Sequence, residues 1–294
     1  IINIYNIGQK INHRLFNISI GKKFTNGFIR NNHDVLEISD RDFVKQNRTL
    51  NLSNTHKVFQ EYLIETVKNY NPNMIFFGHS ENIDIETLKE IKSLSNEIII
   101  SQWNEDPMMK SLNDSMLNIN KLLKYNDYVD ANFITTDPMV VKSRNKLISN
   151  LNFFFVPVDK NIETYSVYNM NPDNDLFYAM SHGVNRAILK RGKFDERVLF
   201  LNKLIKKINY IKYDFYGYKN REPVWGNNFF KALTNSKMGL NLSRGNPTPY
   251  YTSNRIASLI GNGLLTFIDK KTKLNEIFNN DEVVFYENID DLSS

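Results

Sequence analysis

The stretch KMGLNLSRGNPTPYYTSNRIASLIGNGLLTFID, residues 237–269, decides the fold of the second half of the chain. It begins with an apolar run, KMGLNLSRG, that predicts a buried strand. A polar loop, NPTPYYT, separates this strand from an apolar helix, SNRIASLIGNG, and a second strand, LLTFID, follows at once. A strand, a helix and a strand in this rhythm favour parallel strands in a doubly wound sheet.

The same rhythm extends in both directions from this stretch. In the first half, strands are expected at 2–8, 33–39, 73–80, 97–106, 128–137 and 151–158, with helices at 21–32, 55–72 and 83–95. In the second half, strands are expected at 175–183, 212–218, 237–245, 264–269 and 282–288, with helices at 194–208, 227–236, 253–263 and 272–280. Residues 159–174 are polar and aperiodic, which predicts a linker between a first domain, 1–158, and a second, 175–294. We therefore expect an α/β protein whose two Rossmann-like domains face a cleft.

Composition excludes several classes of function. The chain has 294 residues, 41% of them hydrophobic, which is enough for two domains with cores of their own. It has no cysteine, which excludes disulfides and thiolate metal sites, and its five histidines form no HExxH-like pair, so we expect no metal. A net charge of +5 suits an anionic partner, but no face is dense enough in lysine and arginine to predict nucleic-acid binding.

Location can also be predicted from the sequence. The longest apolar runs, such as NFFFVPV, are too short to span a membrane, and no signal-peptide pattern opens the chain. We therefore expect a cytoplasmic protein. Lys270, Lys271 and Lys273 form a basic cluster that would allow peripheral contact with anionic lipid at the inner face of a membrane, although a solvated loop is the alternative. Because there is no initiator methionine, we expect a few residues before Ile1.

The end of one strand and the start of the next helix within 237–269 bring together groups suited to an anion. The strand ends where parallel sheets bind ligands, and the helix start offers unpaired N–H groups and a positive partial charge. The candidate residues are Ser243, Arg244, Gly245, Thr252, Ser253, Asn254 and Arg255. Thr252, Ser253 or Asn254 is expected to cap the helix, while the two arginines add charge and bidentate hydrogen bonding. The alternative is an ordinary capped helix with solvated arginines.

Two further loops of the second half carry candidate binding residues. SHGVNRAILKRG follows the first strand of this half, so His182 and Gly183 stand at a strand-to-helix turn and Arg186 can meet a diphosphate. The turn has a single glycine and does not match GxGxxG, so a solvated basic loop is the alternative. In YDFYGYKN, residues 213–220, Tyr218 is a candidate to pack on a nucleotide base, and the alternative is an ordinary connecting loop.

The first half contributes polar residues after two of its strands. FGHS ends with His79 and Ser80, and SQWNEDPMM brings Glu105 and Asp106 to the same edge of the predicted sheet. Neighbours on an extended segment point apart, so Glu105 and Asp106 are not a carboxylate pair; one of them can act as a base or hold a sugar hydroxyl. His79 is the weaker candidate, because a lone histidine is more often structural. The alternative for Asp106 is an Asp-Pro turn.

The order of these motifs resembles a known family. DLFYAMSHGVNR, YDFYGYKNREPVWGNNFFKALTNSKMGLNLSRG, YYTSNRIASLIGNGLLTFID and DEVVFYENIDDL are similar to the C-terminal domain of GT-B glycosyltransferases, in particular the CgeB-like group of glycosyl transferases group 1. SQWNEDPMM and FFFVPVD of the first half resemble the same group. The resemblance covers most of the chain and is most specific from Lys237 to Asp269. It also implies one or two further helices after Ser294.

The resemblance implies a function and a site. Such enzymes bind a nucleotide-sugar on the second domain and an acceptor on the first, and transfer the sugar, usually with retention of configuration, without a metal or a cofactor. The implied donor-binding residues are His182, Gly183, Arg186, Tyr216, Gly217, Tyr218, Asn241, Ser243, Arg244, Gly245, Tyr250, Thr252, Ser253, Asn254, Arg255 and Ser258. Asp106, Glu105 and His79 are the catalytic candidates on the acceptor side. The acceptor would be a glycan, a lipid-linked molecule or a protein, as in cell-envelope polysaccharide biosynthesis.

The chain departs from the family at two positions. Large retaining families carry two glutamates eight residues apart, and the corresponding positions here are Tyr250 and Ser258. A serine reaches a ribose only at short range and without charge. This departure keeps two other functions open: a GT-B-like protein that binds nucleotide or glycan without catalysis, and a nucleotide-sugar epimerase, for which only Glu105 and Asp106 are placed as acid and base.

Overall fold

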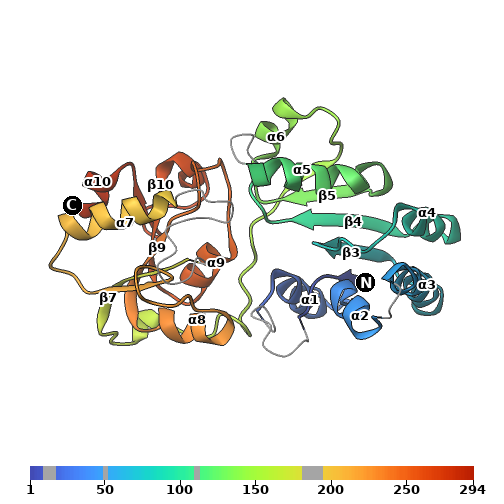
Figure 1. Ribbon diagram of the computed structural model, residues 1–294, viewed down its shortest axis with the longest axis horizontal. Coiled ribbons are helices and arrows are strands. Elements are labelled where there is room, and N and C mark those ends of the chain that lie inside the picture. Colours follow the sequence, from blue (N-terminus) through green and yellow to red (C-terminus); the bar gives the residue numbers. More distant parts are fainter. Residues whose placement is uncertain (9–17, 49–51, 109–112, 181–194) are drawn as a thin grey trace. The chain divides into compact units, whose positions relative to one another are not determined.

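The computed structural model describes residues 1–8, 18–48, 52–108, 113–180 and 195–294. The chain divides into two compact units, Ile1–Pro157 (unit 1) and Val158–Ser294 (unit 2), each with strands flanked by helices (Figure 1). The predicted classes of structure, a parallel α/β sheet in each half, are confirmed.

Unit 1 contains a six-stranded sheet in the order β2-β1-β3-β4-β5-β6, and all of its pairings are parallel. Its elements are β1 (Ile2–Ile4), α1 (Ile20–Arg30), β2 (Leu36–Ile38), α2 (Asp40–Gln46), α3 (Leu52–Tyr70), β3 (Met74–Gly78), α4 (Ile85–Leu94), β4 (Ile99–Asn104), α5 (Asn113–Tyr125), η1 (Asn126–Tyr128), β5 (Ala131–Ile134), α6 (Pro138–Arg144) and β6 (Leu151–Phe153). The helices α2, α5 and α6 were not among the expected ones.

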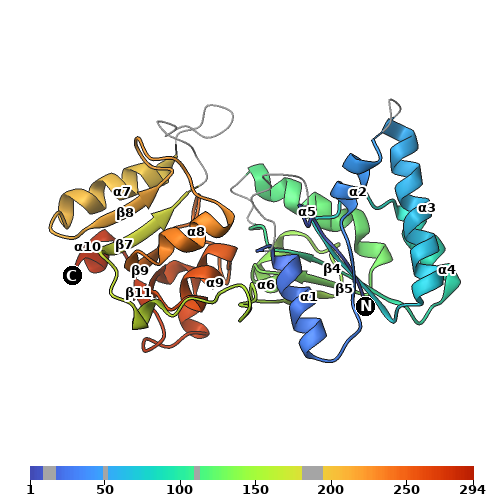
Figure 2. The same cartoon turned by 90° about the horizontal axis from the view of Figure 1, so that it is seen from below.

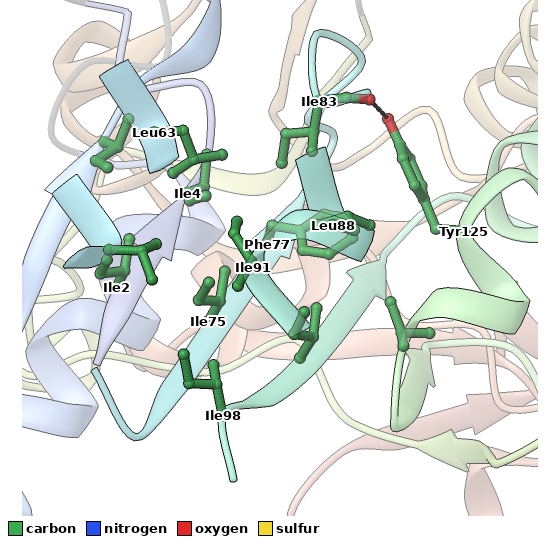
Figure 3. Close-up of a cluster of buried hydrophobic side chains, with 14 of the residues drawn as sticks. Ile2, Ile4, Leu63, Ile75, Phe77, Ile83, Leu88, Ile91, Ile98 and Tyr125 are labelled. Carbon is green, nitrogen blue, oxygen red and sulfur yellow. Dashed lines mark hydrogen bonds between the residues drawn. The ribbon is translucent and has the colours of Figure 1, made fainter. Parts of the chain in front are cut away.

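Both faces of this sheet are buried, which explains why its strands are continuous apolar runs. On one face, Ile75 and Phe77 of β3 pack against α3 and α4, as the cluster in Figure 3 shows. Phe76 points the other way because successive strand residues alternate, and it meets Phe24 of α1 edge-on, with ring centroids 5.0 Å apart. Trp103 of β4 lies on the α1 side as well, 5.4 Å from Phe24.

Unit 2 repeats the plan with five parallel strands in the order β11-β10-β9-β7-β8. Its elements are η2 (Val167–Asn169), β7 (Asn174–Ala179), α7 (Glu196–Lys207), β8 (Tyr213–Tyr216), α8 (Gly226–Leu233), β9 (Ser236–Asn241), α9 (Asn254–Gly261), β10 (Leu265–Asp269), η3 (Lys270–Thr272), η4 (Leu274–Glu276), β11 (Val284–Tyr286) and α10 (Ile289–Ser293).

The helices of unit 2 cover opposite faces of its sheet. Leu201 and Leu204 of α7 pack on one face together with α10, whereas α8 and α9 lie on the other, as Figure 2 shows. Gly239 of β9 is the point of closest approach to α9, because a Cβ there would lie 2.6 Å from Leu259 Cδ2. A glycine at this position therefore lets α9 pack tightly on the strand.

The segment 159–174, which the sequence predicts as a linker, packs on unit 2: Asn262 accepts hydrogen bonds from Tyr165 N at its side chain (3.0 Å) and from Val167 N at its carbonyl (2.9 Å). One expectation for this half needs correction. The helix expected at 272–280 is wrong, since η3 and η4 are short 3-10 turns. They meet at Lys273, whose φ of 57° is left-handed and interrupts a continuous helix.

The strand orders fix where ligands can bind. In unit 1 the connections after β1 and β3 leave in opposite directions, and in unit 2 the same is true of those after β7 and β9. In open α/β sheets such switch points form a crevice outside the carboxyl ends of the strands. A ligand site is therefore expected among the residues that follow β3 and β9.

Candidate functional site

The switch point of unit 2 lies between the segments that follow β7 and β9. The first of these, with the predicted His182, Gly183 and Arg186, lies outside the described residues after Met180. The second is the loop 242–253, which ends at the N-terminus of α9. Its geometry can be followed bond by bond.

Hydrogen bonds fix the loop 242–253 at both ends. The carbonyl of Leu242 accepts from Tyr178 Oη at 3.0 Å and from Arg255 Nη1 at 2.8 Å. Tyr250 N donates to Thr272 O at 2.7 Å, and Tyr250 adopts a left-handed φ of 59°. A non-glycine residue is held in this region only where its surroundings determine it, so the loop is a built conformation.

The start of α9 offers a polar group without a partner. Ser253 is the N-cap residue, one of the three predicted candidates, yet its hydroxyl makes no capping bond. Its Oγ is buried without a hydrogen-bond partner among the described residues. Ser19, by contrast, caps α1 through Lys22 N. The hydroxyl of Ser253 thus stands unused beside the positive end of a helix.

Asn241, at the end of β9, carries a second such atom. It is 5% exposed, and its Oδ1 has no partner among the residues described. It follows Gly239 by two residues, so it lies on the face of the strand that α9 covers. Thr252 is buried as well, at 1% exposed. Buried polar groups therefore gather at the start of α9, and Arg244 of the preceding loop is exposed.

The two arginines of this region differ in role. Arg255 is bound to Leu242 O, and its guanidinium lies 5.4 Å from the ring centre of Tyr178. It therefore holds the loop in place rather than extending toward a ligand. Arg244 is exposed beside Ser243 and Gly245, where the chain turns with a φ of 73° at the glycine.

The predicted base-stacking residues lie elsewhere than expected. Tyr218 is 6% exposed, packs edge-on against Phe215 and donates its hydroxyl hydrogen to Asn202 of α7. A ring buried in this core cluster does not stack on a base, so this expectation needs correction. Tyr216 is half-buried, and the Arg221 guanidinium covers its ring at 3.6 Å. Gly217 forms the left-handed turn between the two tyrosines, with a φ of 68°.

The two positions that depart from the family are both engaged in packing. Tyr250 donates its hydroxyl hydrogen to Glu276. Ser258 is 1% exposed on the buried face of α9, and its carbonyl accepts both the backbone N–H and the Nδ2 of Asn262. In this conformation the Ser258 hydroxyl is out of reach of a ligand in solution.

In unit 1, the ends of β3 and β4 form an ion pair. His79 Nε2 lies 2.5 Å from Glu105 Oε2, with side chains 20% and 26% exposed. The strands pair in register up to Gly78 and Trp103, and His79 and Glu105 are each the first residue after the end of their strand. His79 is also held in a left-handed conformation, with a φ of 53°.

The charges of this pair stabilise each other. Burial by itself would lower the pKa of His79, but the charge and hydrogen bond of Glu105 outweigh it and raise the pKa to about 9. Burial likewise would raise the pKa of Glu105, and the charge of His79 reverses this, so that pKa is lowered. At neutral pH the pair is therefore imidazolium and carboxylate, with His79 donating the hydrogen bond.

Other polar groups surround this ion pair. Arg41 donates to the carbonyl of His79 at 3.1 Å, while Asp106 N donates to Asn104 Oδ1 at 2.8 Å. The Nε1 of Trp103 is buried without a partner among the described residues, and its ring lies edge-on to His79 at 5.7 Å. A cavity of about 80 Å³ is lined by His79 and Trp103.

Sequence reasoning missed the His79–Glu105 pair, Arg41, Trp103 and Arg221. The pair could have been found from strand register, since both residues follow neighbouring strands by one position. Arg41 and Arg221 carry no local signal, because they reach their partners from an unexpected helix and from a loop.

Among the described residues, no helix is both long enough and apolar enough to cross a membrane. No cluster of three or more histidine, cysteine or acidic side chains suited to a metal ion occurs in this part of the chain.

The fold defines a class: a protein of two units, each built on a parallel α/β sheet. The chain matches the family model of glycosyl transferase-like proteins over residues 196–294, its last third. A search of curated proteins gave no match. The match covers the part of unit 2 that begins at α7, and it supports a glycosyl transferase-like character for that part of the chain.

Solved structures resemble the chain in fold. The N-terminal domain of trehalose-6-phosphate phosphatase from Candida albicans has a TM-score of 0.52 at 8% identity, covering 99% of this chain and 86% of that one. T4 phage β-glucosyltransferase has a TM-score of 0.46 at 12% identity, covering 99% and 86%. HepE of Anabaena, solved with UDP and glucose, has a TM-score of 0.45 at 9% identity, covering 92% and 77%. At these identities the likeness concerns the fold alone.

Proposed function

We propose that this protein transfers a sugar from a nucleotide-sugar to an acceptor, with the diphosphate bound at the start of α9. One observation carries the proposal: the hydroxyl of Ser253 is buried and unpartnered among the described residues, at a helix N-terminus that a fixed loop presents. An unpartnered buried polar atom destabilises a protein by about 1–3 kcal/mol, and a bound ligand would offset this.

The diphosphate would be bound by three kinds of group. The Ser253 hydroxyl donates a hydrogen bond, the first N–H groups of α9 face the phosphate, and the exposed Arg244 adds a positive charge. His182, Gly183 and Arg186 would complete the site from the segment after β7. Asn241, Ser243, Gly245, Thr252, Asn254 and Arg255 would shape it from behind.

The chemistry would be carried by charge. As the bond between the sugar and the diphosphate breaks, negative charge accumulates on the departing phosphate oxygen. The helix N-terminus and Arg244 stabilise that charge in the transition state more than in the bound substrate, which lowers the barrier. We propose that transfer requires neither metal nor cofactor and retains the configuration of the sugar.

The acceptor would bind in unit 1 near the His79–Glu105 pair. A protonated His79 cannot accept a proton, so it would donate a hydrogen bond to an acceptor oxygen. Glu105 is bound to His79, which leaves Asp106 as the carboxylate we assign to accept a proton from the acceptor hydroxyl. The acceptor would be a glycan, a lipid-linked molecule or a protein.

We place the protein in the cytoplasm, with peripheral membrane contact as the route to a lipid-linked acceptor. Lys271 and Lys273 are exposed, whereas Lys270 forms an ion pair with Glu287 at 2.6 Å. Two exposed lysines would add about 1 kcal/mol each to binding at an anionic surface.

A second candidate function is binding of a nucleotide or glycan without catalysis. Tyr250 and Ser258, which replace the two glutamates of large retaining families, are both engaged in packing. Assays of sugar transfer and of donor hydrolysis separate the two functions, since tight binding without turnover of any donor would favour the second.

Nucleotide binding tests the proposal through two matched serines. UDP, GDP, CDP and dTDP are added in turn, and at 100 times its Kd a binder stabilises the protein by about 2.7 kcal/mol. Ser253→Ala should weaken this binding and leave the free protein at least as stable as before, because it removes a buried hydroxyl that has no partner among the described residues. Ser19→Ala should do the reverse, losing about 1 kcal/mol of stability with its cap and none of the binding.

Two results would count against the donor site. One is a melting temperature that none of the four nucleotides changes. The other is a Ser253→Ala variant that binds its nucleotide as tightly as the wild type.

A further inference from the structure

Unit 2 contains a cavity that extends beyond the proposed donor site. Its volume is about 640 Å³, and it opens at the carboxyl ends of β9, β10 and β11, between α7 and the residues around α10. None of its described lining residues belongs to α9. The loop 242–253 contributes Ser243, Gly245 and Thr248 to it, so this loop would border both sites.

The buried part of this cavity is polar but carries no net charge. Arg197, Thr248, Thr272 and Tyr286 line it with at most 6% exposure. Arg197 forms a two-point ion pair with Asp195, through hydrogen bonds of 2.9 and 2.7 Å. Asp195 is 1% exposed, so its buried carboxylate neutralises the charge of the Arg197 guanidinium. An anionic ligand would lose its hydration here without gaining a counter-charge, and it would also meet the half-buried carboxylate of Asp269.

Tyr286 offers this cavity a buried hydroxyl that a ligand could bind. It is 2% exposed, and its hydroxyl has no hydrogen-bond partner among the described residues. Burial, with the neighbouring Asp269 and Tyr178, raises the pKa of this phenol, so it remains a neutral donor. Its ring lies 6.3 Å from that of Phe200, which gives the cavity an aromatic wall.

The rim of the cavity mixes both signs of charge. Lys203 and Lys271 are exposed there together with Glu196 and Glu287. Lysines donate hydrogen bonds and carboxylates accept them. A ligand whose groups both donate and accept would satisfy this rim, and one with a single strong charge would meet a like charge.

We infer that this cavity binds a neutral carbohydrate ring. Sugar hydroxyls both donate and accept hydrogen bonds, which matches the buried phenol, Thr248 and the mixed rim, and the apolar face of a sugar packs on aromatic rings. The site adjoins the proposed donor site at α9 and shares Asn241, Ser243 and Gly245 with it, and it would hold sugar residues of an acceptor or product glycan away from the reacting atoms.

Sugar binding in the absence of nucleotide tests the inference. Saturation-transfer NMR is recorded on the whole chain with D-glucose, D-galactose, D-mannose and N-acetyl-D-glucosamine, each separately. At least one is expected to bind, and Tyr286→Phe should weaken that binding about five- to tenfold, as loss of one hydrogen bond implies. Tyr210→Phe, in the same unit but 77% exposed, is the matched control and should bind as the wild type does.

Two controls separate a lost site from a lost fold. Tyr286→Phe should melt no lower than the wild type, because it removes a hydroxyl without a described partner. It should also bind nucleotides as the wild type does, so the experiment tests the carbohydrate site and the donor site separately. Absence of binding for all four sugars, or sugar binding that Tyr286→Phe leaves unchanged, would overturn the inference.

Discussion

Replacing Glu105 by glutamine should lower the pKa of His79 from above to below neutral pH, so that the imidazole loses its charge at pH 7. The substitution keeps the shape of the side chain and removes the charge that faces His79 Nε2 at 2.5 Å. Burial, which lowers the pKa of His79, would then be opposed mainly by Asp106 and assisted by the charge of Lys121. We expect the pKa of His79 to fall from about 9 to near its ordinary 6.5 or below.

The size of the effect follows from the two pKa values of the histidine. A difference between about 9 and 6.5 corresponds to roughly 3 kcal/mol, at about 1.4 kcal/mol per pH unit. Because the folded pKa is the higher one, this stabilisation is complete below pH 6.5 and is lost as pH rises through 9. The lowered pKa of Glu105 adds stability only above its ordinary 4.5, so the full effect of the pair lies between pH 4.5 and 6.5.

Two assays measure this. NMR titration of the His79 imidazole Cε1–H reports the pKa directly, and urea unfolding at pH 6 and at pH 9.5 reports the free energy of unfolding. Glu105→Gln should destabilise the protein by about 3 kcal/mol at pH 6, as an upper value for a partly solvated pair, and by much less at pH 9.5. Glu97→Gln, at an exposed glutamate, is the control and should change neither quantity.

The reasoning would be refuted by a His79 that titrates near pH 6.5 in the wild type. A loss of stability that is the same at both pH values would refute it too, because it would show that shape and not charge stabilises the pair.

Two further predictions concern the packing of unit 2. Gly239→Ala should lower the free energy of unfolding by about 1–3 kcal/mol, because the new Cβ would lie 2.6 Å from Leu259. The control is Gly27→Ala in α1, where a Cβ meets nothing within 4 Å, and it should raise the free energy of unfolding by about 0.5–1 kcal/mol. Chemical denaturation measures both, and a change of the same sign in the two variants would contradict this. Asn262→Ala should lower the free energy of unfolding by about 2–3 kcal/mol and increase proteolysis within 159–170, because Asn262 is fully buried and its side chain accepts a hydrogen bond from Tyr165 N. An unchanged cleavage pattern would show that this hydrogen bond does not hold the segment in place.

The rhythm of apolar strands and amphipathic helices was sufficient to predict both sheets. Strands buried on both faces leave long apolar runs, so β3 and β9 stood out in the sequence. The prediction of a helix at 272–280 was wrong, because the apolar spacing there fits two 3-10 turns that meet at Lys273 as well as it fits a helix. Spacing records which residues are buried and not how the backbone turns between them.

The candidate site was predictable only in part. The position of Ser253 at the start of α9 followed from its local sequence, because caps and helix starts are local features. The unused hydroxyl, by contrast, depends on neighbours brought in by the fold. Tyr218 was misjudged for the same reason: the turn after β8 directs its ring into the core, where it meets Asn202 of α7.

The most direct test of the account is whether a nucleotide diphosphate meets the start of α9. Backbone amide resonances are followed by 15N NMR as UDP, GDP, CDP or dTDP is titrated into the protein. The account predicts the largest shifts at the amides of Ser253, Asn254 and Arg255, with little change at the Tyr210 amide. No shift at the start of α9 at saturating nucleotide would contradict it.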